Sequence, residues 1–153
     1  MDEQRLKDEA ELLRWSLEAG FRTVCDAVAW ADSVIEAHPQ PPISIIEISL
    51  AGRRSPADMA TLLAAVPGEP AATASRRKWF TEVLRVLDAQ PEMGEAVARV
   101  LARLTAAEVL PSDEFGWDAY GLVDAFELAR QGVAGTYDAA MDDLRDYLTR
   151  HAR

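Results

Sequence analysis

Apolar residues recur along most of this chain at spacings of three and four, the period of an amphipathic α-helix. Over residues 3–19 the apolar stripe consists of Leu6, Ala10, Leu13 and Leu17. Charged residues occupy the opposite face, and Gly20 follows as a residue suited to the left-handed backbone of a helix end. The first predicted element is therefore a helix over residues 3–19.

The same period, together with helix start signals, predicts most of the remaining elements. Thr23 with Asp26 three residues later is a capping pair, and Ser55 followed by Pro56 is a typical helix start. Clusters of Pro and Gly separate the periodic segments. Helices are predicted over residues 24–37, 56–66, 76–89, 91–107, 117–130 and 137–151.

The segment 43-ISIIEISL-50 is ambiguous between helix and strand. Its β-branched residues favour a strand, but no second convincing strand exists with which it could pair. Ile43, Ile46 and Leu50 also fit the spacing of one helical face, so we expect a short helix here.

About eight helices joined by short loops predict an all-α fold, either a bundle or a compact array of helical hairpins, with no substantial β-sheet. The length of 153 residues suits a single domain, residues 1–153. The stretch 67-PGEPAATAS-75 is predicted to be a loop, and it is the candidate position for a sub-division into two halves.

The formal net charge is −10, and the acids are concentrated near both ends. Residues 1–40 carry 9 acids against 4 bases, and residues 111–153 carry 9 against 4. This charge favours basic partners and argues against nucleic acid and anionic membranes, although a net charge of this size more often serves solubility alone. A single cysteine, an acidic N-terminus and the lack of an apolar run of about 20 residues indicate a soluble cytoplasmic protein.

The last predicted helix, 136-TYDAAMDDLRDYLTRH-151, carries an aspartate at every fourth position. Asp138, Asp142 and Asp146 lie beside an apolar seam that includes Met141, Leu144 and Leu148. These aspartates are either a binding surface for a basic partner or the solvated side of a terminal helix.

Helix 117–130 supplies a second candidate surface. Its predicted inward stripe contains Leu122 and Phe126, which leaves other residues on the opposite side: Trp117, Tyr120, Asp124 and Glu127. Aromatic side chains beside carboxylates are typical of a hot spot for a basic partner, and packing against a neighbouring helix explains the same pattern.

The letters 142-DDLRD-146 resemble the D-D-x-x-D motif with which class I prenyltransferases and terpene synthases hold Mg²⁺. The match covers five residues, no second metal-binding motif faces it, and Arg145 would compete for the carboxylates. His38 and His151 fit no zinc pattern, and no Gly-rich phosphate loop is present. We therefore expect no catalytic residue, no metal ligand and no cofactor, with a small Mg²⁺-dependent enzyme as an alternative.

Two further stretches combine helix-boundary residues in a recognisable order. The first is 15-WSLEAGFRTVCDAVAWADSVIEAHPQPPISIIEISLAG-52, in which a W-A-D helix precedes a Pro break and an I-x-x-I-S-L segment. The second is 117-WDAYGLVDAFELARQGVAGTYDAAMDDLRDYL-148, in which a helix ends in A-R-Q-G before a second amphipathic helix. Together they resemble small all-α bacterial proteins, often uncharacterised, of which some are similar to immunity proteins of bacterial toxin systems.

The resemblance implies action by occlusion of a partner. The first functional hypothesis is thus a non-enzymatic protein-interaction domain, in one form an immunity-type inhibitor that occludes a basic toxin domain. A helical scaffold or regulatory subunit, whose charge only keeps it soluble, is the alternative.

Overall fold

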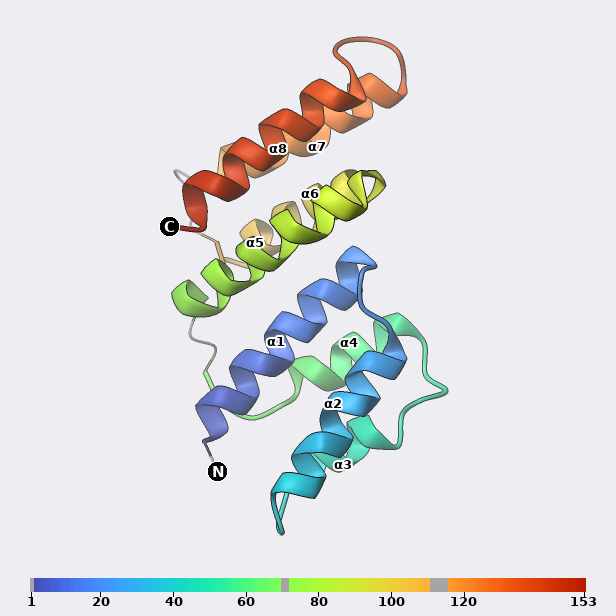
Figure 1. Ribbon diagram of the computed structural model, residues 1–153, viewed down its shortest axis with the longest axis vertical. Helices are drawn as coiled ribbons and strands as arrows, with labels where there is room; N and C mark the ends of the chain where they lie inside the picture. Colours follow the sequence, from blue (N-terminus) through green and yellow to red (C-terminus); the bar gives the residue numbers. More distant parts are fainter. Residues whose placement is uncertain (1, 70–71, 111–115) are drawn as a thin grey trace. The chain divides into compact units, whose positions relative to one another are not determined.

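The computed structural model describes residues 2–69, 72–110 and 116–153, with the backbone alone described at residues 72, 116 and 117. These residues form eight α-helices and one short 3₁₀ helix, and no strand is found among them, which confirms the predicted all-α class (Figure 1). The chain divides into two compact units, residues 1–71 and residues 72–153. The division falls within the stretch 67–75 that the sequence marks as a boundary.

The first unit contains α1 (Glu3–Ala19), α2 (Val24–Ala37), α3 (Ile43–Ser49) and α4 (Pro56–Ala64). The helix α1 packs against α4, and α2 packs against α3 (Figure 1). Their facing sides enclose one apolar cluster of buried side chains, which includes Leu6, Ala10, Ala31, Ile45, Ile48, Met59 and Leu63.

Capping geometry confirms the predicted end of α1 and the predicted starts of α2 and α4, whereas α4 ends at Ala64, two residues before its predicted end at 66. Gly20 ends α1 with a φ of 88°, a conformation that costs glycine little. The Thr23 hydroxyl accepts from the Asp26 amide at 3.3 Å, and the Asp26 carboxylate accepts from the Thr23 amide at 2.7 Å. The hydrogen bond from the Thr23 backbone lowers the pKa of Asp26. Ser55 likewise accepts from the Asp58 amide at the start of α4.

A buried charge network ties α1 to the end of α4. The Lys7 ammonium lies 3.0 Å from the Glu11 carboxylate and donates to the Ala64 carbonyl at 2.7 Å. Arg14 donates to the same Glu11 carboxylate at 3.0 Å. A Cβ at Gly68, where φ is +122°, would approach the Lys7 Cβ to 2.9 Å, so the chain can pass the lysine stem only with glycine there.

The helix α3 forms as predicted, but a different side of it is buried. Ile45 and Ile48 are fully buried in the apolar cluster, whereas the stripe that indicated the helix is exposed. The exposed fractions are 75% for Ile43, 40% for Ile46 and 81% for Leu50. Both sides of this short helix are apolar, so the period alone could not decide which side faces α2.

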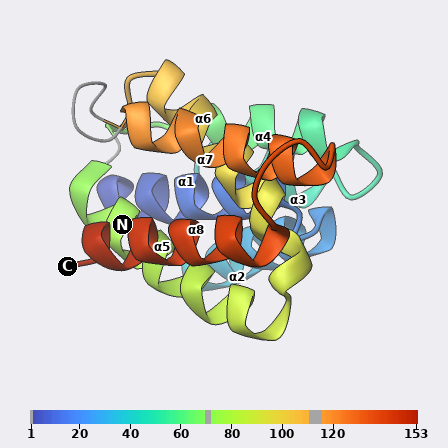
Figure 2. The same cartoon turned by 90° about the horizontal axis from the view of Figure 1, so that it is seen from above.

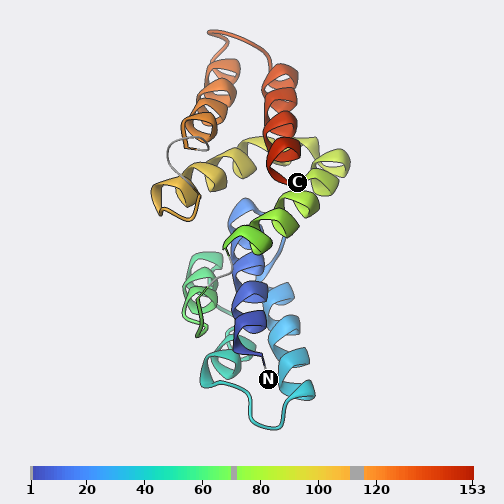
Figure 3. The same cartoon turned by 90° about the vertical axis from the view of Figure 1, so that its left-hand side faces the viewer.

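The second unit contains α5 (Ala72–Ala89), the 3₁₀ helix η1 (Pro91–Met93), α6 (Gly94–Ala106), α7 (Gly116–Arg130) and α8 (Tyr137–His151). The helices α7 and α8 run antiparallel as a hairpin (Figure 3), and α8 also packs against α5 (Figure 2). The helix α6 makes its most extensive contact with α7. The last helix is therefore supported by both α5 and α7.

The helix α5 begins at Ala72, four residues before its predicted start at 76. The predicted loop relied on Gly68 and Pro70, yet the alanines that follow favour a helix. The earlier start also moves the basic run 76–78 away from the positive end of the helix dipole. Trp79 and Phe80, which follow this run, are fully buried.

Candidate functional site

Four aspartates project from the exposed side of α8: Asp138, Asp142, Asp143 and Asp146. We call these residues the acidic face of α8. Among the residues that the structure describes, none of the four carboxylates has an ion pair or a side-chain hydrogen bond. The opposite side of the helix is buried through Ala140, Met141, Leu144, Tyr147 and Leu148. The acidic face is therefore held toward solvent by an apolar side that leaves the helix little freedom to rotate.

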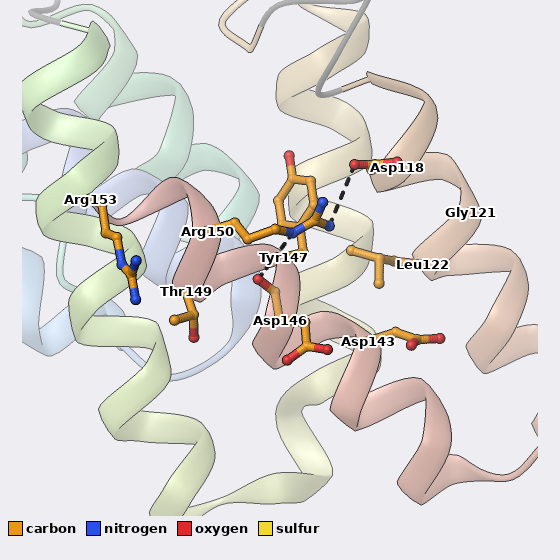
Figure 4. Close-up of a pocket in the computed structure, with 9 residues that line it drawn as sticks. All are labelled: Asp118, Gly121, Leu122, Asp143, Asp146, Tyr147, Thr149, Arg150 and Arg153. Atoms are coloured by element: carbon orange, nitrogen blue, oxygen red, sulfur yellow. Dashed lines mark hydrogen bonds and ion pairs between the residues drawn. The ribbon is translucent and has the colours of Figure 1, made fainter.

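The first of two hollows beside α8 lies between α7 and α8, with a volume of about 630 Å³, and we call it the α7–α8 hollow (Figure 4). Its lining comprises Asp118, Gly121, Leu122, Asp143, Asp146, Tyr147, Thr149, Arg150 and Arg153. The Arg150 guanidinium reaches across it to lie 3.6 Å from the Asp118 carboxylate, and it also approaches the Asp146 carbonyl at 3.4 Å (Figure 4). Three carboxylates and two guanidinium groups thus share this hollow.

Tyr147 is the largest buried side chain of the α7–α8 hollow, with 1% of its surface exposed. Its ring centroid lies 6.2 Å from that of Phe80 and 4.7 Å from that of His151. Burial, reinforced by the negative charge of Asp118, raises the pKa of Tyr147 to about 12. The phenol is therefore neutral at physiological pH, and it serves as a packing residue with a polar tip.

The second hollow lies between α8 and η1, with a volume of about 610 Å³, and we call it the α8–η1 hollow. Its lining comprises Pro91, Glu92, Tyr137, Asp138, Met141, Asp142 and Arg145. The Tyr137 hydroxyl donates to the Pro91 carbonyl at 2.7 Å, and burial raises the pKa of this phenol. Pro91, Tyr137 and Met141 give the hollow an apolar surface beside three carboxylates.

Among the described residues that line the α8–η1 hollow, Arg145 is the one basic side chain, and it contacts α5. Its guanidinium donates to the Leu87 carbonyl at 3.3 Å and lies 3.7 Å from the Asp88 carboxylate. Glu92, Asp138 and Asp142 form no ion pair with any residue in the described part of the chain. The α8–η1 hollow therefore has negative charge that its own arginine does not neutralise.

The predicted surface on α7 is not brought into either hollow. Tyr120 is 46% exposed and Asp124 is exposed, whereas Glu127 is already bound by Arg130 and by Gln131. The hydrogen bond from Arg130 is the main cause that lowers the pKa of Glu127. The side chain of Trp117 lies outside the described residues.

The residues of the D-D-x-x-D match do not converge. Asp142 lines the α8–η1 hollow, while Asp143 and Asp146 line the α7–α8 hollow on the other flank of α8. Over the described ranges, no group of three or more His, Cys, Asp or Glu residues is placed so that it could hold a metal ion.

The sequence did not single out several residues that line the two hollows: Asp118, Tyr147, Glu92 and Arg150. Asp118 approaches α8 because the α7–α8 hairpin is antiparallel, which brings the start of one helix beside the end of the other. Tyr147 carried a weak local signal, since it lies three residues after Leu144 on the buried side. Nothing in the local sequence around Glu92 indicates that η1 approaches α8.

Comparisons with protein-family models, with curated proteins and with solved structures find no match. Within the described ranges, none of the helices combines the length and the apolar character that crossing a membrane would require.

Proposed function

We propose that this protein is a non-enzymatic protein-interaction domain that binds a basic partner through the acidic face of α8. The observation that supports the proposal most strongly is the α8–η1 hollow. Within the described part of the chain, Glu92, Asp138 and Asp142 surround an apolar surface there without ion-pair partners, and α5 holds Arg145 of the hollow.

The hollow suits a lysine or arginine side chain of the partner. The methylene groups of such a side chain can cover Met141 and Tyr137 while its charged end approaches the carboxylates. Each exposed pair of this kind contributes little alone, about 0.2–1 kcal/mol, so several must act together. The summed negative field also accelerates association by about 10- to 1,000-fold at low salt.

The finer form of the proposal is an immunity-type inhibitor that occludes a basic toxin domain. It is supported by the resemblance of residues 15–52 and 117–148 to small proteins of that kind, and by a surface whose charge suits a cationic cleft. The mechanism would be steric and electrostatic, with the protein covering the cleft.

A capture experiment tests the proposal with a variant that reverses the charge of three aspartates of the acidic face of α8. Asp138→Lys, Asp142→Lys and Asp146→Lys are combined in the tagged protein, and the folded state is verified by circular dichroism. The matched control combines Glu36→Lys, Glu47→Lys and Glu69→Lys, which are exposed acids of the first unit and change the net charge equally. Lysate of the cells that make the protein is applied at low and at moderate salt.

The expected result is a basic protein that the wild type and the control retain and that the α8 variant loses. Retention should weaken as salt rises, because exposed ion pairs are screened. Loss of the partner from both variants would reduce the proposal to an effect of net charge. Equal retention by all three proteins would contradict it, and the aspartates would then be the solvated side of α8.

A further inference from the structure

A second surface, on the first unit, has the opposite character to the acidic face of α8. The helix α3 is apolar on two sides, and its outer side exposes Ile43, Ile46 and Leu50. These residues are spaced at i, i+3 and i+7, so they form one continuous ridge along the short helix. Isolated exposed apolar residues are ordinary, but a contiguous apolar stripe on a helix is typical of a binding surface.

Two cations follow this ridge directly in the sequence. Arg53 and Arg54 are exposed, and neither forms an ion pair with any residue that the structure describes. Three other cations of the first unit differ in this respect, since Arg5 pairs with Glu9 and both Lys7 and Arg14 pair with Glu11. Unpaired arginines in a chain of net charge −10 are available to an acidic group from outside.

We propose that Ile43, Ile46, Leu50, Arg53 and Arg54 form a docking surface for an amphipathic helix of a partner protein, with acidic residues at one end of that helix. We call these five residues the α3 surface. A helical ridge packs best against the ridge and groove of another helix, and its three anchors match the spacing by which amphipathic helices are bound. Carboxylates of the partner would form bidentate pairs with the guanidinium groups.

This inference goes beyond the proposed function, because the α3 surface selects acidic partners and the acidic face of α8 selects basic ones. Glu47, the one charged residue of α3, is exposed beside the ridge and gives the partner helix a preferred orientation. The contact is small, so the expected affinity is weak and the interaction transient.

The first experiment selects binding peptides from a displayed random library, each peptide long enough for about four helical turns. Selection uses the whole folded protein, and a parallel selection uses the double variant Ile43→Gln, Leu50→Gln. Because both side chains are mostly exposed, the variant is expected to fold like the wild type. The control variant Val133→Gln removes an exposed apolar side chain from the second unit.

We expect one family of peptides that is enriched on the wild type and on Val133→Gln and is absent from the double variant. Its members should carry large apolar residues at helical spacing and a net negative charge. One synthetic member is then titrated by fluorescence anisotropy, and Arg53→Glu with Arg54→Glu should weaken its binding by about tenfold or more.

Other results would overturn the inference. The inference fails if the enriched peptides are basic, or if the same peptides are enriched on the double variant as on the wild type. It also fails if no peptide is enriched on the wild type. Sedimentation showing a dimer that Ile43→Gln, Leu50→Gln dissociates would assign the α3 surface to a second copy of the chain. Binding to phosphatidylcholine–phosphatidylglycerol vesicles that the same variant abolishes would assign it to a lipid surface. None of these results depends on the acidic face of α8, so the two proposals fail separately.

Discussion

At the scale of single residues, the second unit places similar groups in different electrostatic settings. Glu127 on α7 is neutralised by Arg130, whereas Asp142 on α8 forms no ion pair with any residue that the structure describes, although the sequence assigned both to a partner surface. Whether a carboxylate forms an ion pair depends on the direction in which its helix face points and on whether a nearby residue supplies a cation. The apolar pattern identified the exposed side of α7 and of α8, but it could not identify which of their acids already had ion-pair partners.

Tyr147 gives a residue-scale prediction of pH dependence. The unfolded chain has a tyrosine pKa of about 10, and burial raises the pKa of Tyr147 to about 12 in the folded chain. The stability that this difference provides is complete below pH 10 and is lost as pH rises from about 10 to about 12. Between pH 10 and pH 12 the unfolding free energy of the Tyr147→Phe protein should therefore fall less than that of the wild type. The difference between the two falls should be about 2 kcal/mol or less.

Urea denaturation at a series of pH values measures this difference. The matched control is Tyr120→Phe, which removes a hydroxyl from a half-exposed tyrosine of α7 and should preserve the wild-type slope. A Tyr147→Phe protein whose stability falls as steeply as that of the wild type above pH 10 would show that burial of the phenol is not linked to its ionisation.

At the scale of the helices, capping residues predicted the boundaries better than apolar period predicted the faces. Gly20, Thr23 and Ser55 act locally, so their roles follow from a few neighbouring residues. The buried side of α3 depends on α2, which lies across the 38–42 break, and the isoleucines on both sides of α3 made the choice ambiguous. The helix caps could therefore be predicted from the sequence, whereas the choice between the two apolar sides of α3 depended on its packing against α2.

The Thr23 cap supplies the prediction at this scale. Replacing Thr23 with Ala removes the acceptor of the Asp26 amide at the start of α2 and should lower the unfolding free energy by about 1 kcal/mol. Thr61→Ala is a suitable control, because its hydroxyl bonds a carbonyl one turn earlier inside α4 and caps no helix end. Denaturation midpoints measure both effects, and a loss at Thr23 no larger than that at Thr61 would show that the cap contributes nothing.

At the scale of the whole molecule, the all-α class followed from the sequence because the helical period repeats along most of the chain. The Gly and Pro residues of 67–75 mark the stretch in which the chain passes from one compact unit to the next. The two hollows could not be predicted, because one depends on how α8 pairs with α7 in the hairpin and the other on the approach of the 3₁₀ helix η1, which is distant in sequence. Asp118 and Glu92 enter the site only through those contacts.

The central claim is that unpaired carboxylates of the α8–η1 hollow bind a basic partner. The most direct measurement is a titration of the captured partner against wild type and against the triple variant Glu92→Gln, Asp138→Asn, Asp142→Asn, which removes charge with little change of shape. The matched control is Glu36→Gln, Glu47→Gln, Glu69→Gln. The account predicts that the hollow variant binds at least about tenfold more weakly and with a shallower dependence on salt, while the control stays within about threefold of wild type. Equal affinities for the two variants would contradict it.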